Sequence, residues 1–160
     1  MGRENRGWVY ISEAAARLHP LYGLDGWLWL IAAKLLLGPP LILLFHDVVL
    51  ANEFAPYKTD FAHILLVTGP HVLYSWFVFF LMIWRRERFR THFTLLSLLE
   101  IGGSAVGVAL IGLHDLAFRH FVLTPIFLAY IYLSKRINVT FLLRVRSTDP
   151  FLAVMRPSPS

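Results

Sequence analysis

Long apolar runs alternate with short polar segments along the chain. Because a helix needs about 20 apolar residues to cross a bilayer core of about 30 Å, a run of that length predicts a transmembrane helix. The first three runs are long enough, and the fourth lies near the lower limit of about 17 residues. The pattern therefore predicts an all-α integral membrane protein with four transmembrane helices. In chain order the runs cover residues 27–50, 61–84, 93–113 and 118–134.

The segments that join these runs are short. Residues 85–92 and 114–119 predict tight turns, and the loop at residues 51–60 has too few residues to fold alone. Helices joined by short connections run antiparallel as neighbours, so we expect an up-and-down four-helix bundle. The chain then divides into an interfacial N-terminal segment, a transmembrane domain and a basic cytoplasmic C-terminal tail, at residues 1–23, 24–134 and 135–160.

Both flanking segments contain further predicted helix. Residues 12–18 have the composition of a short helix on the membrane surface, and Pro20 stops it. Residues 135–146 are expected to continue the fourth transmembrane helix into the cytoplasm. Asp149 and Pro150 should then break that helix.

The distribution of basic residues predicts the orientation. Arginine and lysine gather in the two terminal segments and between the second and third runs, whereas the other two connections hold only Lys58 and Arg119. Cytoplasmic segments carry such an excess of basic residues. Both termini are therefore predicted to be cytoplasmic, as an even number of spans requires. The arginines between the second and third runs, which we also expect to contact lipid headgroups, are Arg85, Arg86, Arg88 and Arg90.

The composition agrees with a membrane protein and excludes several functions. Apolar residues make up 57% of the chain and the mean hydropathy is +0.60, against about 45–50% apolar residues in soluble domains. The absence of cysteine excludes disulfides and thiolate metal sites. The net charge of +5 follows the predicted topology, so we expect no nucleic-acid partner. Because no catalytic motif is present, we expect neither an enzyme nor a cofactor, only bound lipid.

Two charged residues lie within the predicted spans. Lys34 comes eight residues after Gly26, and Glu100 comes eight residues after His92, so each lies about 12 Å from the cytoplasmic side. A charge inside a span costs roughly 2.5–3.5 kcal/mol on insertion scales, and therefore requires a partner. We expect Lys34 and Glu100 to form an intramembrane ion pair. The pair is either structural or part of a proton or ion relay.

The third run contains small residues at helical spacing. Gly103 and Gly107 lie four residues apart and share one helix face, where they let a neighbouring backbone approach closely. Such a face serves either packing within the bundle or docking of another subunit. The sequence leaves both interpretations open.

Histidine and aspartate collect near the predicted outer ends of the helices. Two pairs, His46-Asp47 and His114-Asp115, have the ligand types that bind zinc or copper(II). No fixed-spacing metal motif supports these pairs, and polar residues also gather wherever helices leave the lipid. Only His71 lies well within a span, so a haem held by two histidines is not expected.

Two stretches resemble a bacterial inner-membrane family described as domain of unknown function 2569. Residues 26–30 (GWLWL), followed by Leu37-Gly38-Pro39, resemble its opening "GGWL…LSP". Residues 132–141 (YLSKRINVTF) are similar to its closing "YFLxSKRVKNTF". The resemblance covers residues 21 to about 143 and implies four helices in a bacterial cytoplasmic membrane, but no activity. The chain departs from the family at Asp25, where glycine is usual, and in its short first outer loop.

Three functions from different classes remain. Small size, the absence of a catalytic motif and the small-residue face favour a non-catalytic accessory or assembly subunit beside a larger membrane complex. Lys34, Glu100 and the prolines within the spans favour a small oligomeric transporter or a proton-conducting or ion-conducting protein. The outer histidines favour a metal-binding membrane protein. We expect the accessory subunit, with membrane lipids and another integral membrane protein as partners.

Overall fold

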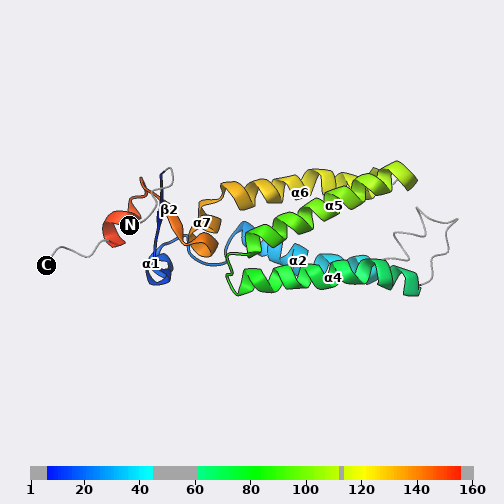
Figure 1. Ribbon diagram of the computed structural model, residues 1–160, viewed down its shortest axis with the longest axis horizontal. Coiled ribbons are helices and arrows are strands. Elements are labelled where there is room, and N and C mark those ends of the chain that lie inside the picture. Colours follow the sequence, from blue (N-terminus) through cyan, green and yellow to red (C-terminus); the bar gives the residue numbers. More distant parts are fainter. Residues whose placement is uncertain (1–6, 45–60, 112–113, 156–160) are drawn as a thin grey trace. The chain divides into compact units, whose positions relative to one another are not determined.

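The computed structural model describes residues 7–44, 61–111 and 114–155, which are mostly helical (Figure 1). The chain divides into two compact units. The helical unit is Asp25–Ala129, and the terminal unit combines Met1–Leu24 with Tyr130–Ser160. The predicted all-α class is confirmed, although the described residues also include a two-stranded sheet.

Most of the helical unit consists of four long helices. They are α2 (Trp27–Leu44), α4 (Phe61–Ile83), α5 (Phe89–Ile111) and α6 (His114–Leu133). Helix α4 contacts both α2 and α5 (Figure 1). Helix α6 begins in the helical unit, and its residues from Tyr130 onward belong to the terminal unit.

Helices α2 and α4 begin at the expected residues, whereas α5 and α6 begin four residues earlier than expected. The tight turn predicted at residues 114–119 is wrong, because α6 begins at His114 and these residues are helical. They include no glycine or proline that would stop a helix. Helix α5 likewise begins at Phe89, so the connection from α4 occupies only residues 84–88.

The predicted continuation of the fourth helix through residues 135–146 is also wrong. Helix α6 ends at Leu133, and the separate helix α7 (Lys135–Leu142) follows Ser134. Ser134 Oγ accepts a hydrogen bond from the backbone N–H of Ile137 at 3.5 Å, and a serine in this role favours a new helix start. Beyond α7 the chain enters strand β2 (Arg144–Arg146).

One helix in the described part of the chain is long and apolar enough to cross a membrane. It is the 21-residue segment Phe89–Ala109 of α5. The other apolar helical segments are shorter than the about 20 residues that a span requires. These segments are Trp27–Leu41, Thr68–Ile83 and His120–Leu133. Four membrane spans therefore stay a prediction.

Helix α2 stays continuous through two consecutive prolines because α4 supplies the missing hydrogen bonds. Pro39 and Pro40 lack the N–H groups that would bond the carbonyls four residues earlier, at Leu35 and Leu36. Ser75 Oγ donates to the Leu35 carbonyl at 3.0 Å. Trp76 Nε1 donates to the Leu36 carbonyl at 3.1 Å. These two bonds compensate the backbone groups that the prolines leave without an intrahelical partner.

The connection between α4 and α5 is a Schellman turn without glycine. Arg85 adopts a left-handed backbone with φ of 52°. Its N–H donates to the Met82 carbonyl at 3.0 Å, and the N–H of Arg86 donates to the Leu81 carbonyl at 2.9 Å. A left-handed conformation costs roughly 1–2 kcal/mol for a residue with a Cβ. The turn is therefore strained at Arg85.

Besides the last residues of α6, the terminal unit contains a two-stranded sheet and the short helices α1 (Glu13–Leu18), α7 and α8 (Phe151–Met155). Strand β1 (Trp8–Tyr10) pairs antiparallel with β2, with Val9 opposite Val145. Helix α1 matches the helix expected at residues 12–18. Ser12 caps it by accepting a hydrogen bond from the N–H of Ala15 at 3.2 Å.

The terminal unit has its own apolar core. Ala16, Val139 and Val145 are buried, and Val9 and Ile11 pack against them. These residues come from opposite ends of the chain, so the core joins two segments that the sequence analysis treated separately. Burial of apolar surface from water accounts for their assembly.

Hydrogen bonds add to this association. The N–H of Ile11 donates to the Leu143 carbonyl at 2.8 Å, and the N–H of Gly23 donates to Thr140 Oγ1 at 3.1 Å. Between α1 and α8, His19 Nε2 lies 3.6 Å from Asp149 Oδ2, and the His19 side chain is only 4% exposed. Helix α7 and the residues that follow it are thus held to the N-terminal segment by polar and apolar contacts.

Candidate functional site

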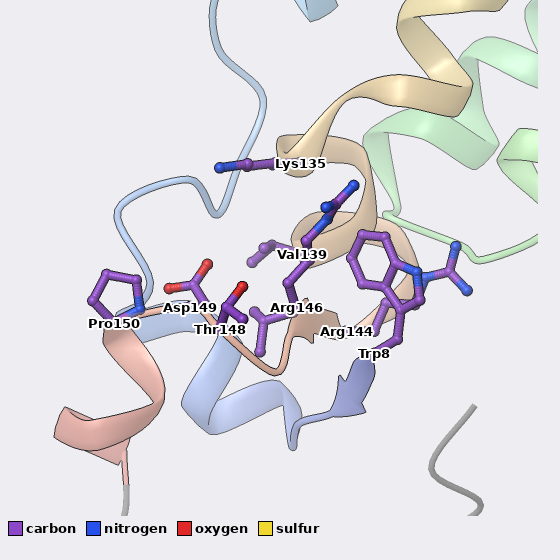
Figure 2. Close-up of a pocket in the computed structure, with 9 residues that line it drawn as sticks. Trp8, Lys135, Val139, Arg144, Arg146, Thr148, Asp149 and Pro150 are labelled. Carbon is purple, nitrogen blue, oxygen red and sulfur yellow. The ribbon is translucent and has the colours of Figure 1, made fainter. Parts of the chain in front are cut away.

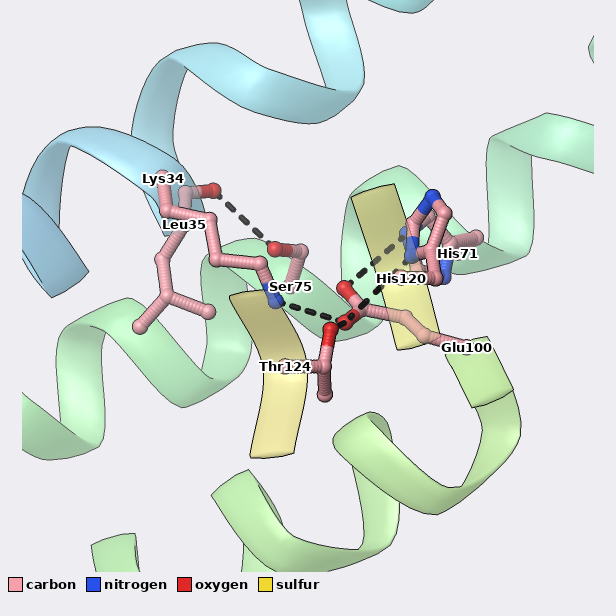
Figure 3. A network of polar contacts seen from close by, with 7 residues as sticks. All are labelled: Lys34, Leu35, His71, Ser75, Glu100, His120 and Thr124. Atoms are coloured by element: carbon pink, nitrogen blue, oxygen red, sulfur yellow. Dashed lines mark hydrogen bonds and ion pairs between the residues drawn. The ribbon is translucent and has the colours of Figure 1, made fainter. Parts of the chain in front are cut away.

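Polar side chains from all four long helices meet at one carboxylate (Figure 3). Glu100 lies near the middle of α5, and its side chain is only 6% exposed. Lys34 approaches it from α2, His71 from α4, and His120 and Thr124 from α6. A buried carboxylate must be paired or hydrogen-bonded. This cluster of five residues, here called the Glu100 cluster, meets that requirement.

Lys34 provides the ionic partner. Its Nζ lies 2.5 Å from Glu100 Oε2, so the structure brings together the two residues that the sequence analysis paired. The same ammonium lies 5.7 Å from the ring centroid of Phe93 and 6.0 Å from that of Phe127. Both distances suit cation–π attraction. Lys34 is therefore held by a carboxylate and two aromatic faces.

Thr124 and two imidazoles complete the surroundings of the carboxylate. Thr124 is 1% exposed, and its Oγ1 donates to Glu100 Oε2 at 3.3 Å. His71 Nε2 lies 4.0 Å from Oε1, and His120 Nδ1 lies 3.9 Å from Oε2. In Figure 3 the histidines approach the carboxylate from the side opposite Lys34. Each carboxylate oxygen thus faces one imidazole.

The distances constrain what the cluster can do. A separation near 4 Å exceeds the hydrogen-bond range of about 2.7–3.2 Å, so an imidazole and the carboxylate exchange a proton only through a water molecule or after a side-chain rotation. Carboxylate and imidazole side chains can both bind and release protons. The arrangement has the chemistry of a proton-binding site whose negative charge Lys34 balances.

Ser97 adds a further polar group on the same face of α5. It precedes Glu100 by three residues, a spacing that places two side chains on one helix face. Its Oγ is buried and has no hydrogen-bond partner within the described ranges. A buried hydroxyl of this kind can hold a water molecule.

The small-residue face of α5 is open at Gly103. Gly103 is exposed, and a Cβ added there would have nothing within 4 Å. Its neighbour Gly102 is also exposed and equally open, whereas Gly107 is half-buried. No helix of the described structure packs closely on Gly103.

The other predicted site residues lie away from the Glu100 cluster or outside the described residues. Arg85, Arg86 and Arg88 are exposed in the turn between α4 and α5, and Arg90 lies half-buried in the first turn of α5.

The side chains of the two predicted metal-binding pairs lie outside the described part of the structure. His46 and Asp47 lie outside the described residues. His114 and Asp115 lie in the first turn of α6, and their side chains lie outside the described part. Within the residues that were described, no three His, Cys, Asp or Glu side chains form a group that could hold a metal ion.

The sequence did not predict that His71, His120 and Thr124 lie beside Glu100. The fourth helix was expected to begin at residue 118, only two residues before His120, whereas α6 begins at His114. His120 and Thr124 are four residues apart, a spacing that places them on one helix face. This spacing is the one sequence feature that indicates a shared polar face on α6. Nothing in the sequence relates this face to Glu100, because the contact depends on how α6 meets α5.

Comparisons with protein-family models, curated proteins and solved structures gave no match. The resemblance to the four-helix family of unknown function stays a prediction. The chemistry of the Glu100 cluster is therefore the basis for a functional proposal.

Proposed function

We propose that the helical unit crosses a bacterial cytoplasmic membrane four times, with both termini on the cytoplasmic side and lipid around its helices. Large apolar side chains on its surface support this, among them Leu73 and Leu99, which are 66% and 64% exposed. Apolar side chains face outward where the surroundings are lipid, and charged ones turn inward. The arginine-rich connection between the second and third runs supports the orientation.

Because the chain has no cysteine, single introduced cysteines test this topology without background labelling. Glu87→Cys marks the connection between α4 and α5, and Lys58→Cys marks the predicted outer loop. In intact cells an impermeant maleimide should label only Lys58→Cys, and both variants should react after the membrane is permeabilised. Labelling of both variants in intact cells would contradict the proposal.

We propose further that the Glu100 cluster binds and transfers a proton within this bundle. The observation that carries this proposal is the position of Glu100, whose two carboxylate oxygens each face an imidazole from a different helix. Intramembrane ionisable residues are expensive and commonly mark proton or ion pathways. A purely structural pair of Lys34 and Glu100 would not need two histidines beside it.

The proposed transfer follows from the order of the groups. A proton taken up by His71 or His120 passes, through a bridging water, to the carboxylate of Glu100. Protonation neutralises Glu100 and weakens its attraction to Lys34, so proton binding loosens the contact between α2 and α5. Release of the proton restores the ion pair.

A flux measurement tests proton transfer. Purified protein is reconstituted into vesicles that enclose a pH-sensitive dye, and a potassium diffusion potential drives protons inward. Wild-type protein should acidify the lumen faster than empty vesicles do, and Glu100→Gln should lower the rate to that of empty vesicles. Glu87→Gln is the matched control, because it removes an exposed carboxylate from the connection between α4 and α5.

Equal proton flux in the Glu100→Gln and wild-type vesicles would contradict the proposal, provided that both proteins elute as the same folded particle. Absence of wild-type flux above the empty-vesicle rate would contradict it as well. His71→Gln and His120→Gln then separate the two imidazoles, since the one that carries the proton should show the greater loss.

The accessory subunit expected from the sequence stays a second candidate. The specific observation in its favour is the open surface at Gly102 and Gly103, which would admit close approach of a helix from another integral membrane protein. Purification from native membranes in mild detergent tests it. Recovery in stoichiometric amount with a larger complex supports the accessory role, whereas a particle of this chain alone contradicts it.

A further inference from the structure

A small basic pocket lies in the terminal unit, formed by residues from both ends of the chain. Its volume is about 70 Å³. Because a water molecule needs roughly 10–15 Å³ by the same measure, the pocket has room for about five waters. Figure 2 shows the side chains around it. The lining residues are Trp8, Lys135, Val139, Arg144, Val145, Arg146, Thr148, Asp149 and Pro150.

Two arginines of strand β2 are held at this pocket by the fold. Arg144 is half-buried, and its Nε donates to Asn138 Oδ1 at 2.8 Å. Asn138 is 2% exposed, and its Nδ2 donates in turn to the Ser134 carbonyl at 2.9 Å. The guanidinium carbons of Arg144 and Arg146 lie 4.7 Å and 5.6 Å from the ring centroid of Trp8. A guanidinium held in this way loses little side-chain freedom when it binds an anion.

The charges of the pocket favour an anion. Lys135, Arg144 and Arg146 are cationic, and Asp149 is the one acidic residue of the lining. Asp149 Oδ1 accepts from the N–H of Phe151 at 3.0 Å, and its Oδ2 faces His19 at 3.6 Å. The carboxylate is thus engaged with α8 and His19. The bond from Arg144 to Asn138 uses Nε. In Figure 2 the Arg144 guanidinium lies across the Trp8 ring from Lys135 and Arg146.

We propose that this pocket binds a phosphate group, carried by an anionic lipid headgroup or present as free phosphate. Five non-hydrogen atoms fit the volume, arginine matches phosphate oxygens with paired hydrogen bonds, and Thr148 offers a hydroxyl. Trp8 supplies an amphipathic ring of the kind found where proteins meet lipid headgroups. The proposal stands apart from proton transfer, since it involves neither the Glu100 cluster nor its titration.

Calorimetric titration of the full-length protein in neutral detergent tests the site. Dioctanoyl phosphatidic acid is the probe, and dioctanoylglycerol, which has the same chains and no phosphate, is the matched lipid. Arg146→Gln and Lys135→Gln remove exposed cations from the pocket. Arg17→Gln is the control, because it removes an exposed cation from the same unit outside the lining.

Phosphatidic acid should bind and dioctanoylglycerol should not. Each pocket variant should weaken binding about fivefold, as expected for one basic residue near an anionic headgroup, and the control should weaken it less than about twofold. An equal loss in Arg17→Gln and Arg146→Gln would reduce the effect to net charge and overturn the pocket. Equal binding of the two lipids would overturn it as well.

A competition experiment distinguishes the two sources of phosphate. If inorganic phosphate displaces phosphatidic acid, the pocket accepts the free anion. If phosphatidic acid stays bound at a large excess of inorganic phosphate, the pocket is specific for the lipid headgroup. Circular dichroism of each variant checks that the helices are retained, and a variant that keeps its helices and loses binding supports the assignment.

Discussion

The helical unit buries charged side chains and exposes many large apolar ones, whereas the terminal unit buries a small apolar core and leaves most of its charged side chains at the surface. In the helical unit the Glu100 side chain is 6% exposed, whereas the adjacent Leu99 is 64% exposed. In the terminal unit Val139 and Val145 are each 2% exposed, whereas Arg146 lies at the surface. The helical unit therefore combines a largely apolar exterior with a buried charged cluster in an otherwise apolar interior, whereas the terminal unit has a small apolar core and charged residues at its surface.

This difference in what is exposed indicates that the helical unit suits a lipid environment and the terminal unit suits water. In water, folding is driven by removing apolar surface from the solvent, and the terminal unit follows this rule. Hydrocarbon tails are as apolar as leucine, so burying leucine gains nothing there, while burying a paired charge avoids a large penalty. The proposed membrane location of the helical unit accounts for its apolar exterior and for the pairing of its buried charges. The following predictions test that contrast.

The largest effect is expected at the polar centre. Lys34→Met leaves the Glu100 carboxylate buried without its ionic partner, so the free energy of unfolding should fall by about 3–5 kcal/mol. Denaturant titration in mixed micelles measures it. The double variant Lys34→Met with Glu100→Gln should recover most of the loss, because no buried charge remains. A single variant as stable as the wild type would show that the pair does not hold the bundle.

The exteriors can be compared directly with one substitution. Leu99→Arg places a charge on the surface of α5 and should lower membrane insertion by about 2.5–3.5 kcal/mol. Leu18→Arg is the matched control at a position that is 73% exposed in the terminal unit, and it should change stability by no more than about 0.5 kcal/mol. The fraction of protein integrated into membranes measures the first, and thermal unfolding the second. If the two substitutions had equally small effects, the proposal that the helical unit faces lipid and the terminal unit faces water would be wrong.

A smaller effect is expected where side chains of α4 donate hydrogen bonds to backbone carbonyls of α2. Ser75→Ala removes the donor to the Leu35 carbonyl, which Pro39 leaves without its usual partner, so stability should fall by about 1–2 kcal/mol. In the Pro39→Ala background the same change should be nearly neutral, because the backbone N–H restored at position 39 donates a hydrogen bond to the Leu35 carbonyl. A double-mutant cycle measures this coupling. Strict additivity of the two changes would show that the bond contributes nothing to stability.

The smallest effect is expected at the turn between α4 and α5. Arg85→Gly relieves the left-handed backbone at φ of 52°, so the free energy of unfolding should rise by about 0.5–1 kcal/mol. Arg86→Gly serves as the control, because Arg86 is not among the residues of positive φ and gains no such relief. Thermal unfolding in detergent compares the two. If Arg86→Gly stabilised the protein as much as Arg85→Gly, the gain in stability would come from removing a positive charge and not from relieving the backbone.

Some elements could be predicted from local sequence and others could not. Helix α1 was predictable because Ser12 caps it and Pro20 follows it, and α5 because its apolar run is long. The start of α7 was missed because the residues around Ser134 include no glycine or proline that would end a helix. Only the hydrogen bond that Ser134 accepts identifies it as a helix cap. The left-handed Arg85 was not predictable, since the usual signal for that conformation is glycine.

The candidate site shows the same limit. Lys34 and Glu100 could be paired from the sequence, because a charge within an apolar span requires a partner and both residues were expected at similar depth. His71, His120 and Thr124 lie on helices whose rotation and crossing the sequence does not specify. Their approach to Glu100 therefore became visible only in the structure.

By itself the sequence determined the mostly helical class, the position of each long helix to within a few residues, and the need to pair Lys34 with Glu100. These follow from local hydropathy and from the cost of a charge in apolar surroundings, neither of which depends on distant contacts. Only the tertiary structure decided that two imidazoles face the carboxylate, that Ser75 and Trp76 serve carbonyls freed by prolines, and that both ends of the chain share one core. Those contacts join residues far apart in sequence, because packing between elements places them together.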